Sequence, residues 1–223
     1  MPRSTICSHG CKPVPKGLPL DLRRAPKAVL LLLMFFTIGG CSSYRPSNTD
    51  NICSIFWGET NWYEDARKSN KRWGTPVGVM MAIIKQESSF RADVRPKRPK
   101  WLFIPLPRKS SAYGYAQAQD AAWHDYRKAT GNKGHDRDDF GDAINFVGWY
   151  THMSQQRLGI SKWDPYQQYL AYHEGWGGFR KGSYKRKPKL VSIAKRVKSQ
   201  AEKYNAQLSG CTKSLDKAVK GWF

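Results

Sequence analysis

Helical periodicity from residue 51 to near the C-terminus constrains the fold of this chain more than any other feature. Apolar residues recur three or four positions apart, the spacing that gathers side chains on one face of an α-helix. The spacing predicts helices over 51–69, 76–88, 118–129, 138–158, 165–175 and 190–208. Strand-like alternation is scarce, so we expect a mostly α-helical fold class with a single domain over residues 51–223.

Local signals mark several ends of these helices. Thr75 and Pro76 offer a hydroxyl cap followed by a proline at the first helical position. Gly131 and Gly159 are expected to end the third and fourth helices. Prolines recur so closely between residues 94 and 110 that we predict a long loop there, without a helix or a central strand.

The first forty residues have the pattern of a processing segment. Basic residues precede an apolar run over Ala28–Ile38, which is much shorter than the roughly 20 residues that a membrane-spanning helix needs. This pattern is typical of a signal peptide. Gly39 and Gly40 then lead into Cys41, a sequence that resembles a bacterial lipobox. An ordinary cleavage site and a core strand are the alternatives.

The lipobox resemblance implies a signal peptide over 1–40 and a lipidated tether over 41–50, with acylation of Cys41 as the membrane anchor. Ser42 follows that cysteine, and by the lipoprotein sorting rule this implies the periplasmic side of the outer membrane. Acylation of Cys41 would leave Cys53 and Cys211 in the mature chain. In an oxidising periplasm we expect these two to form a disulfide, two buried free thiols being the alternative.

The charge of the chain restricts its partners. The formal net charge is +21. Because residues 1–40 hold six basic side chains and one acid, the mature chain would keep about +16. Such a charge fits nucleic acid, but the export signal argues against that partner and leaves the cell wall and lipid headgroups. No Cys-x-x-Cys or Cys/His ligand spacing occurs, so no metal and no cofactor are expected.

Glu87 is the residue in this sequence best suited to acid catalysis. On a helix, Ile83 and Ile84 lie one turn before it and Met80 two turns before it. A carboxyl group beside these side chains is partly desolvated, which raises its pKa and lets it act as a general acid near neutral pH. The alternative is a glutamate at the end of a helix that turns to solvent or pairs with a neighbouring cation.

Three segments in order resemble the motifs of lytic transglycosylases with the soluble-lytic-transglycosylase (SLT) domain. Residues 87–90 (Glu-Ser-Ser-Phe) resemble the first motif, and residues 114–117 (Gly-Tyr-Ala-Gln) resemble the second. Residues 171–175 (Ala-Tyr-His-Glu-Gly) resemble the third, in which the family has Asn at position 173. The resemblance covers roughly residues 73–178 and implies a lysozyme-like fold related to goose-type lysozyme.

The resemblance implies that Glu87 is the single acid and base that cuts peptidoglycan glycan strands between N-acetylmuramic acid and N-acetylglucosamine, leaving a 1,6-anhydro sugar. Tyr172 matches the family tyrosine that hydrogen-bonds near the catalytic glutamate. Further side chains are expected to bind substrate or to shape the groove; these are Gln117, Ser110, Ser88, Tyr115, His173 and Glu174. The carboxyl groups of Asp93, Asp120 and Asp142 are expected in a loop, at a cap and on a helix surface.

Several alternatives remain open at the level of sequence. A hydrolysing muramidase would release reducing ends, and a non-catalytic wall-binding lipoprotein would not depend on Glu87. Trp176 and Tyr115 fit a sugar subsite and core packing equally well. The basic loop and the run over Lys181–Lys189 fit either contacts with anionic muramyl peptides or lipid headgroups, or a solvated face. A monomer is expected.

Overall fold

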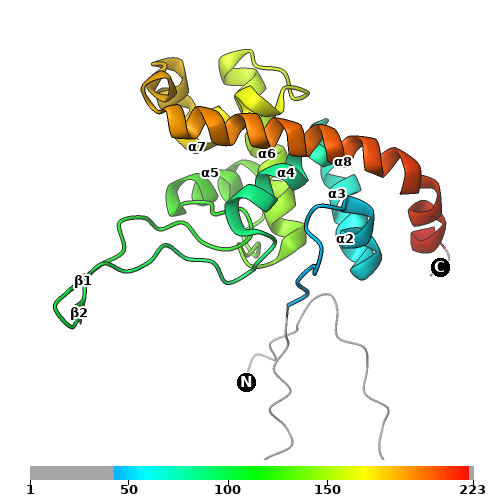
Figure 1. Ribbon diagram of the computed structural model, residues 1–223, viewed down its shortest axis with the longest axis horizontal. Coiled ribbons are helices and arrows are strands. Elements are labelled where there is room, and N and C mark those ends of the chain that lie inside the picture. Colours follow the sequence, from blue (N-terminus) through cyan, green and yellow to red (C-terminus); the bar gives the residue numbers. More distant parts are fainter. Residues whose placement is uncertain (1–42, 221–223) are drawn as a thin grey trace, which may run out of the picture. The chain divides into compact units, whose positions relative to one another are not determined.

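The computed structural model describes residues 43–220 and confirms the mostly α-helical class (Figure 1). The predicted signal peptide and Cys41 lie outside the described residues. In chain order the helices and strands are α2 (Ile52–Gly58), α3 (Thr60–Trp73), α4 (Val77–Ser88), β1 (Lys100–Trp101), β2 (Ile104–Pro105), α5 (Asp120–Thr130), α6 (Phe140–Leu158), α7 (Pro165–Arg180), η3 (Ser183–Arg186) and α8 (Pro188–Lys220).

Several details differ from the sequence predictions in the first half of the domain. The first predicted helix is two helices, because Glu59 has extended backbone and caps α3 by accepting from the Asn61 amide. Pro76 takes the N-cap position of α4, while the Thr75 hydroxyl lies 2.7 Å from that of Thr151 inside the core. The tip of the predicted loop forms a short antiparallel pair, in which Lys100 lies opposite Pro105.

Helix α4 lies at the centre of the core. Every residue over 77–84 is buried, and the helix packs against α8, α6 and α3. The contact with α8 is close at Gly78, where an added Cβ would lie 2.8 Å from the Ala201 carbonyl oxygen. Fully burying one aliphatic side chain contributes roughly 1.5–3 kcal/mol to the stability of the fold. The buried part of α4 therefore fixes the position of its last turn, which carries Glu87.

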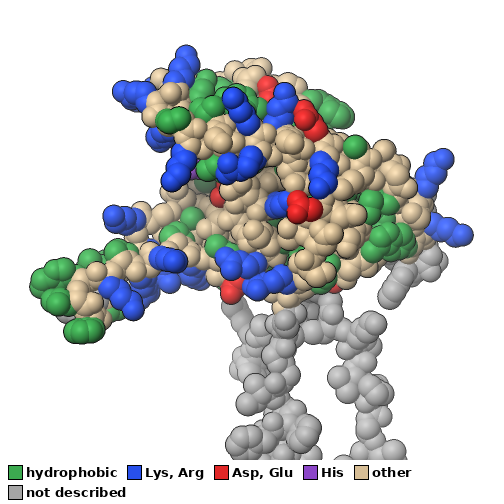
Figure 2. All heavy atoms as spheres, in the orientation of Figure 1, with side chains coloured by type: hydrophobic (Ala, Val, Ile, Leu, Met, Phe, Trp, Pro, Cys, Tyr) green, Lys and Arg blue, Asp and Glu red, His purple; other side chains and the backbone are tan. Residues whose placement is uncertain are grey.

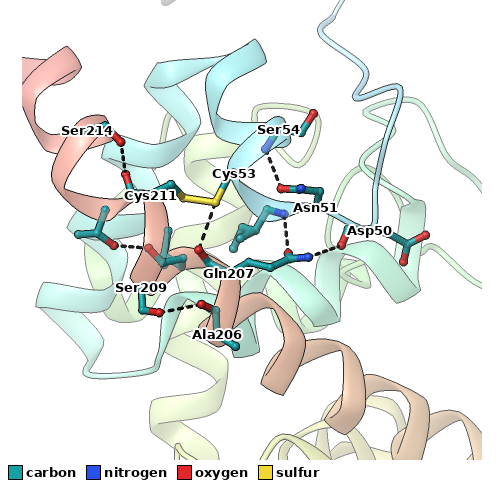
Figure 3. Close-up of a disulfide and its surroundings, with 12 residues drawn as sticks. Asp50, Asn51, Cys53, Ser54, Ala206, Gln207, Ser209, Cys211 and Ser214 are labelled. Atoms are coloured by element: carbon teal, nitrogen blue, oxygen red, sulfur yellow. Dashed lines mark hydrogen bonds between the residues drawn. A yellow bond between two sulfur atoms is a disulfide. The ribbon is translucent and has the colours of Figure 1, made fainter.

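The first and last helices are joined by the predicted disulfide. Cys53 on α2 and Cys211 on α8 are bonded, with their Cα atoms 6.1 Å apart (Figure 3). The Gln207 side chain lies beside the bond, accepting from the Ile52 amide at 3.0 Å and donating to the Asp50 carbonyl at 3.2 Å. The start of the domain is therefore fixed to the helix that covers α4. Within residues 43–220, no helix is both long enough and apolar enough to cross a bilayer.

Candidate active site

Glu87 lies in the last turn of α4 and is partly buried. Met80, Ile83 and Ile84, the side chains expected beside it, are fully buried. Burial raises the pKa of Glu87 to about 7, although a hydrogen bond from Tyr169 works in the opposite direction. The carboxyl group is therefore present in both protonation states near neutral pH, as a group that gives and then takes a proton requires.

Tyr169 is the residue of this site that the sequence did not reveal. It lies on α7, is 3% exposed, and donates its hydroxyl to the Glu87 carboxylate. Tyr172 was predicted to hydrogen-bond near Glu87, and its hydroxyl donates to the Ala116 carbonyl at 2.6 Å. Burial and the charge of Glu87 both raise the pKa of Tyr172, so it does lie in the same electrostatic environment. The sequence does place Tyr169 one helical turn before the motif tyrosine, on the same side of the helix, and this spacing could have identified it as a second residue near Glu87.

The chain leaves α4 through an unusual turn. Ser89 and Phe90 both have left-handed backbone, with φ of 52° and 58°. Such residues cost of order 1–3 kcal/mol each and persist only where their surroundings hold them. Phe90 is fully buried and packs 6.0 Å from Trp62 between ring centroids, which supplies that hold. Ser88 is also buried and donates to the Ile84 carbonyl at 3.3 Å, so it steadies the end of the helix.

The second motif is built as a tight backbone turn. Gly114 has φ of 76°, and a Cβ there would lie 1.9 Å from the Arg137 carbonyl oxygen, so this position requires glycine. Its amide donates to the Val94 carbonyl at 3.1 Å. Gln117, also with positive φ, donates its Nε2 to the same carbonyl at 2.9 Å and to the Gly114 carbonyl at 2.8 Å. The turn therefore holds Gln117 against the base of the 94–110 loop.

Tyr115 and Ser110 were also predicted to bind substrate or to shape the groove around this motif. Tyr115 is 2% exposed, and its ring packs against Trp62 and Phe140 with centroids 5.5 and 5.6 Å away, which places it in the aromatic core. Ser110 is partly buried and accepts from the Ala112 amide at 3.2 Å.

In the third motif, Glu174 forms an ion pair with Lys187, whose own side chain is half-exposed. The Glu174 side chain is 3% exposed, and Lys187 Nζ lies 2.8 Å from one carboxylate oxygen and 3.0 Å from the other. Burial acts to raise the pKa of Glu174, but hydrogen bonds from Lys187, Ser183 and His173 outweigh it and lower the pKa to about 2. Glu174 therefore stays ionised and has no proton to give. His173 is half-exposed, with its Nδ1 3.1 Å from Glu174.

The motif glycine after Glu174 breaks α7. Gly175 has φ of 70° and ψ of 161°, a conformation that only glycine adopts readily. The helix resumes after it, and Trp176 stacks on Tyr150 at 4.8 Å while donating to the Ser154 hydroxyl at 2.9 Å. These contacts favour core packing as the role of Trp176.

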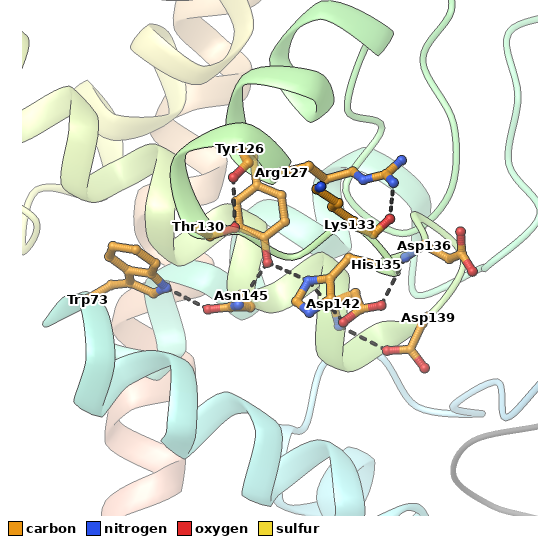
Figure 4. Close-up of polar contacts among 10 residues, drawn as sticks. All are labelled: Trp73, Tyr126, Arg127, Thr130, Lys133, His135, Asp136, Asp139, Asp142 and Asn145. Atoms are coloured by element: carbon orange, nitrogen blue, oxygen red, sulfur yellow. Dashed lines mark hydrogen bonds and ion pairs between the residues drawn. The ribbon is translucent and has the colours of Figure 1, made fainter.

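A chain of hydrogen bonds joins α5 to α6 (Figure 4). Tyr126 Oη lies 2.8 Å from His135 Nδ1 and accepts from Asn145 at 2.7 Å. His135 Nδ1 also lies 3.1 Å from Asp142, and burial raises the pKa of that carboxyl to about 6. The expectation of Asp142 as a plain helix-surface group was therefore wrong. Asp120 pairs with Arg137 at 2.8 Å.

A pocket of about 300 Å³ lies between α4 and α8. Its lining includes Gln86 and Ser89, which flank Glu87 in sequence, and the cations Lys85 and Arg196, but Glu87 itself does not line it. Burial raises the pKa of Tyr169, and the positive charge of Arg196 lowers it. A cation that lines the pocket therefore interacts electrostatically with the tyrosine that contacts Glu87. Among residues 43–220, no three potential metal-ligating side chains are grouped to hold a metal ion.

A comparison with protein families identifies the domain. A protein-family model described as a transglycosylase SLT domain matches residues 29–211, which include all three motifs. No curated protein matches the chain.

Proposed function

This chain belongs to the transglycosylase SLT domain family, and on that basis we infer that it has peptidoglycan lytic transglycosylase activity. From that premise we propose that it cleaves the β-1,4 bond between N-acetylmuramic acid and N-acetylglucosamine and leaves a 1,6-anhydromuramic acid end. The observation that carries this proposal is Glu87, a partly buried carboxyl group whose pKa is raised to about 7 and which is held by Tyr169.

In the first step, protonated Glu87 gives its proton to the glycosidic oxygen as the bond from that oxygen to C1 of the muramic acid breaks. Positive charge develops on C1, and the N-acetyl group of the same sugar stabilises it. The hydrogen bond from Tyr169 favours the carboxylate that this step creates, and so it eases the loss of the proton.

In the second step, the Glu87 carboxylate removes the proton of the C6 hydroxyl while the oxygen of that hydroxyl bonds to C1. The proton returns to Glu87, and water is not consumed. This chemistry needs one carboxyl group, unlike the usual pair of glycoside hydrolysis. The ion pair with Lys187 supports a single-carboxylate mechanism, because Glu174 is the acid of the third motif and is ionised and engaged.

Gln117, Tyr172 and His173 are proposed to contribute to glycan binding around this centre. Tyr172 joins the second and third motifs through the Ala116 carbonyl, so in this proposal it fixes the width of the groove. His173 is half-exposed at the position where the family has Asn, and it offers a ring nitrogen to the substrate.

Digestion of purified sacculi followed by mass spectrometry of the released muropeptides tests the proposal. Wild type should release anhydro products, and Glu87→Gln should release none. Glu202→Gln is the matched control, since its side chain is 63% exposed on α8. Release of reducing ends alone would replace the proposal by a hydrolysing muramidase, and full activity of Glu87→Gln would support a wall-binding lipoprotein.

We also propose that the protein is a monomer anchored by an acylated Cys41 on the periplasmic side of the outer membrane. The apolar run, the Gly-Gly-Cys sequence and Ser42 support this location. Incorporation of labelled palmitate that is lost in Cys41→Ser tests the anchor, and membrane fractionation tests the location. Recovery of unlabelled protein in the cytoplasm would contradict both and revive a nucleic-acid partner.

A further inference from the structure

The 94–110 loop carries an apolar tip that contacts no core. We call residues 100–106 the hairpin tip. Phe103 is 94% exposed, Leu102 72% and Trp101 64%, and Leu106 is also exposed. Figure 1 shows this segment extending away from the helices, and Figure 2 shows hydrophobic side chains gathered at its end. Adjacent exposed apolar side chains of this size mark a surface that binds a partner or a membrane.

Cations surround the tip. Residues 94–110 contain no Asp or Glu, and their six basic residues are Arg95, Lys97, Arg98, Lys100, Arg108 and Lys109. The two arms of the loop are held together near their base, where Arg108 Nε donates to the Pro96 carbonyl at 3.0 Å. An apolar end with a basic collar is complementary to a bilayer with anionic headgroups, since the tip enters the acyl boundary while the cations meet phosphates.

The composition of the tip favours lipid over a glycan. Sugar rings stack on aromatic faces, whereas Leu102 and Leu106 offer none. Trp101 sits between the basic arm and the apolar end, and tryptophan is enriched at this depth in membrane interfaces. Phe103, the most exposed apolar side chain of the tip, would reach furthest into the bilayer.

The start of the described chain lies at the base of this loop. Arg45 pairs with Asp93 at 3.8 Å, and the ring of Tyr44 packs on Trp62 at 5.0 Å. Cys41 precedes Arg45 by four residues, which span at most about 14 Å when fully extended. An acyl chain on Cys41 would therefore attach close to the base of the loop that carries the hairpin tip.

We propose that the hairpin tip inserts into the interface of an anionic phospholipid bilayer and orients the catalytic domain on the membrane. The base of the loop gives this docking a direct consequence for the site. The Val94 carbonyl accepts from both Gly114 and Gln117, so the loop and the second motif are one hydrogen-bonded unit. Docking through the tip would thus set the direction in which the groove faces the cell wall.

Quenching of tryptophan fluorescence by brominated lipids tests the proposal on the full-length protein. The protein is reconstituted in phosphatidylcholine vesicles with or without phosphatidylglycerol, and with bromine on the acyl chains. Trp101→Phe should lose most of the quenching seen in wild type. Trp163→Phe is the matched control, because Trp163 is similarly exposed (73%) but lies before α7, away from the loop, and it should keep the quenching.

The basic collar is tested in the same vesicles. Quenching of Trp101 should be stronger with phosphatidylglycerol and weaker in 0.5 M salt, and the double substitution Lys97→Glu/Arg98→Glu should abolish the difference between the two lipids. Equal quenching in wild type and Trp101→Phe would overturn the proposal and leave the tip to a protein or glycan partner. Muropeptide release by Lys97→Glu/Arg98→Glu is measured in parallel, so that loss of docking is distinguished from loss of the proposed activity.

Discussion

Replacing Glu87 with glutamine should stabilise the folded protein, and should do so more at pH 8 than at pH 5. The pKa of Glu87 is raised from 4.5 to about 7 in the folded state, mainly by burial. A carboxyl group with a raised pKa costs nothing below the unfolded value. The cost grows as pH rises and is complete above the folded value. Glutamine cannot ionise, so it removes this cost.

The magnitude follows from the size of the shift. At pH 8 the ionised carboxylate costs the fold ~3 kcal/mol, and at pH 5 less than ~1 kcal/mol. The advantage of Glu87→Gln should therefore grow by ~2.5 kcal/mol between the two pH values, or roughly 5–10 °C in Tm for a domain of this size. Asp142, whose pKa is raised to about 6, adds its own cost in the same direction, but it is present in both proteins and cancels in their difference.

Denaturant unfolding followed by circular dichroism at the two pH values measures this difference. Both proteins are compared with the disulfide intact, and Glu202→Gln, on an exposed face of α8, serves as the control for loss of a charge. An equal change in the free energy of unfolding at pH 5 and pH 8 would show that ionisation of Glu87 does not destabilise the folded protein. The reasoning that makes it an acid near neutral pH would then fail, even if the variant were inactive.

Three further predictions address the support of the site. Tyr169→Phe removes the hydrogen bond that favours the Glu87 carboxylate, so the alkaline limb of the activity profile should move to higher pH; an unchanged profile would contradict the contact. Reducing the Cys53–Cys211 bond, with a sequence separation of 158, should destabilise the domain by up to ~5 kcal/mol in the chain-entropy model, measured as the shift of the denaturant midpoint. Gly175→Ala should lower stability by ~1–3 kcal/mol in a thermal melt, because its backbone conformation excludes a Cβ, and a neutral result would refute the break in α7.

Periodicity predicted which segments are helical, and it did less well where tertiary contacts decide the ends. The last helix was predicted to end at Leu208, yet α8 continues to Lys220 because Cys211 and Leu215 are buried against the core. Gly175 was expected to end a helix. It changes the helix direction instead, and the continuation is stabilised by the stacking of Trp176.

Spacing along one helix also cannot tell which of two tyrosines reaches a carboxyl group on another. Tyr169 and Tyr172 are three residues apart and lie on the same side of α7. The Tyr172 hydroxyl is occupied by the Ala116 carbonyl, which belongs to the turn of the second motif. Ala116 lies 56 residues before Tyr172 in the chain, so no local sequence pattern predicts this hydrogen bond.

This arrangement separates two tasks around Glu87. The motif tyrosine joins α7 to the turn of the second motif, and a tyrosine outside the motif contacts the carboxylate and lowers its pKa. The contact of Tyr172 depends on the Ala116 carbonyl and therefore on the geometry of the Gly114–Gln117 turn, which the positive φ of Gly114 makes possible. The contact of Tyr169 depends on the direction of α7 before its break at Gly175. In the proposed mechanism the third motif would therefore act through the helix that it shapes as well as through its own side chains. Glu174, bound to Lys187, holds that helix against η3 and the start of α8.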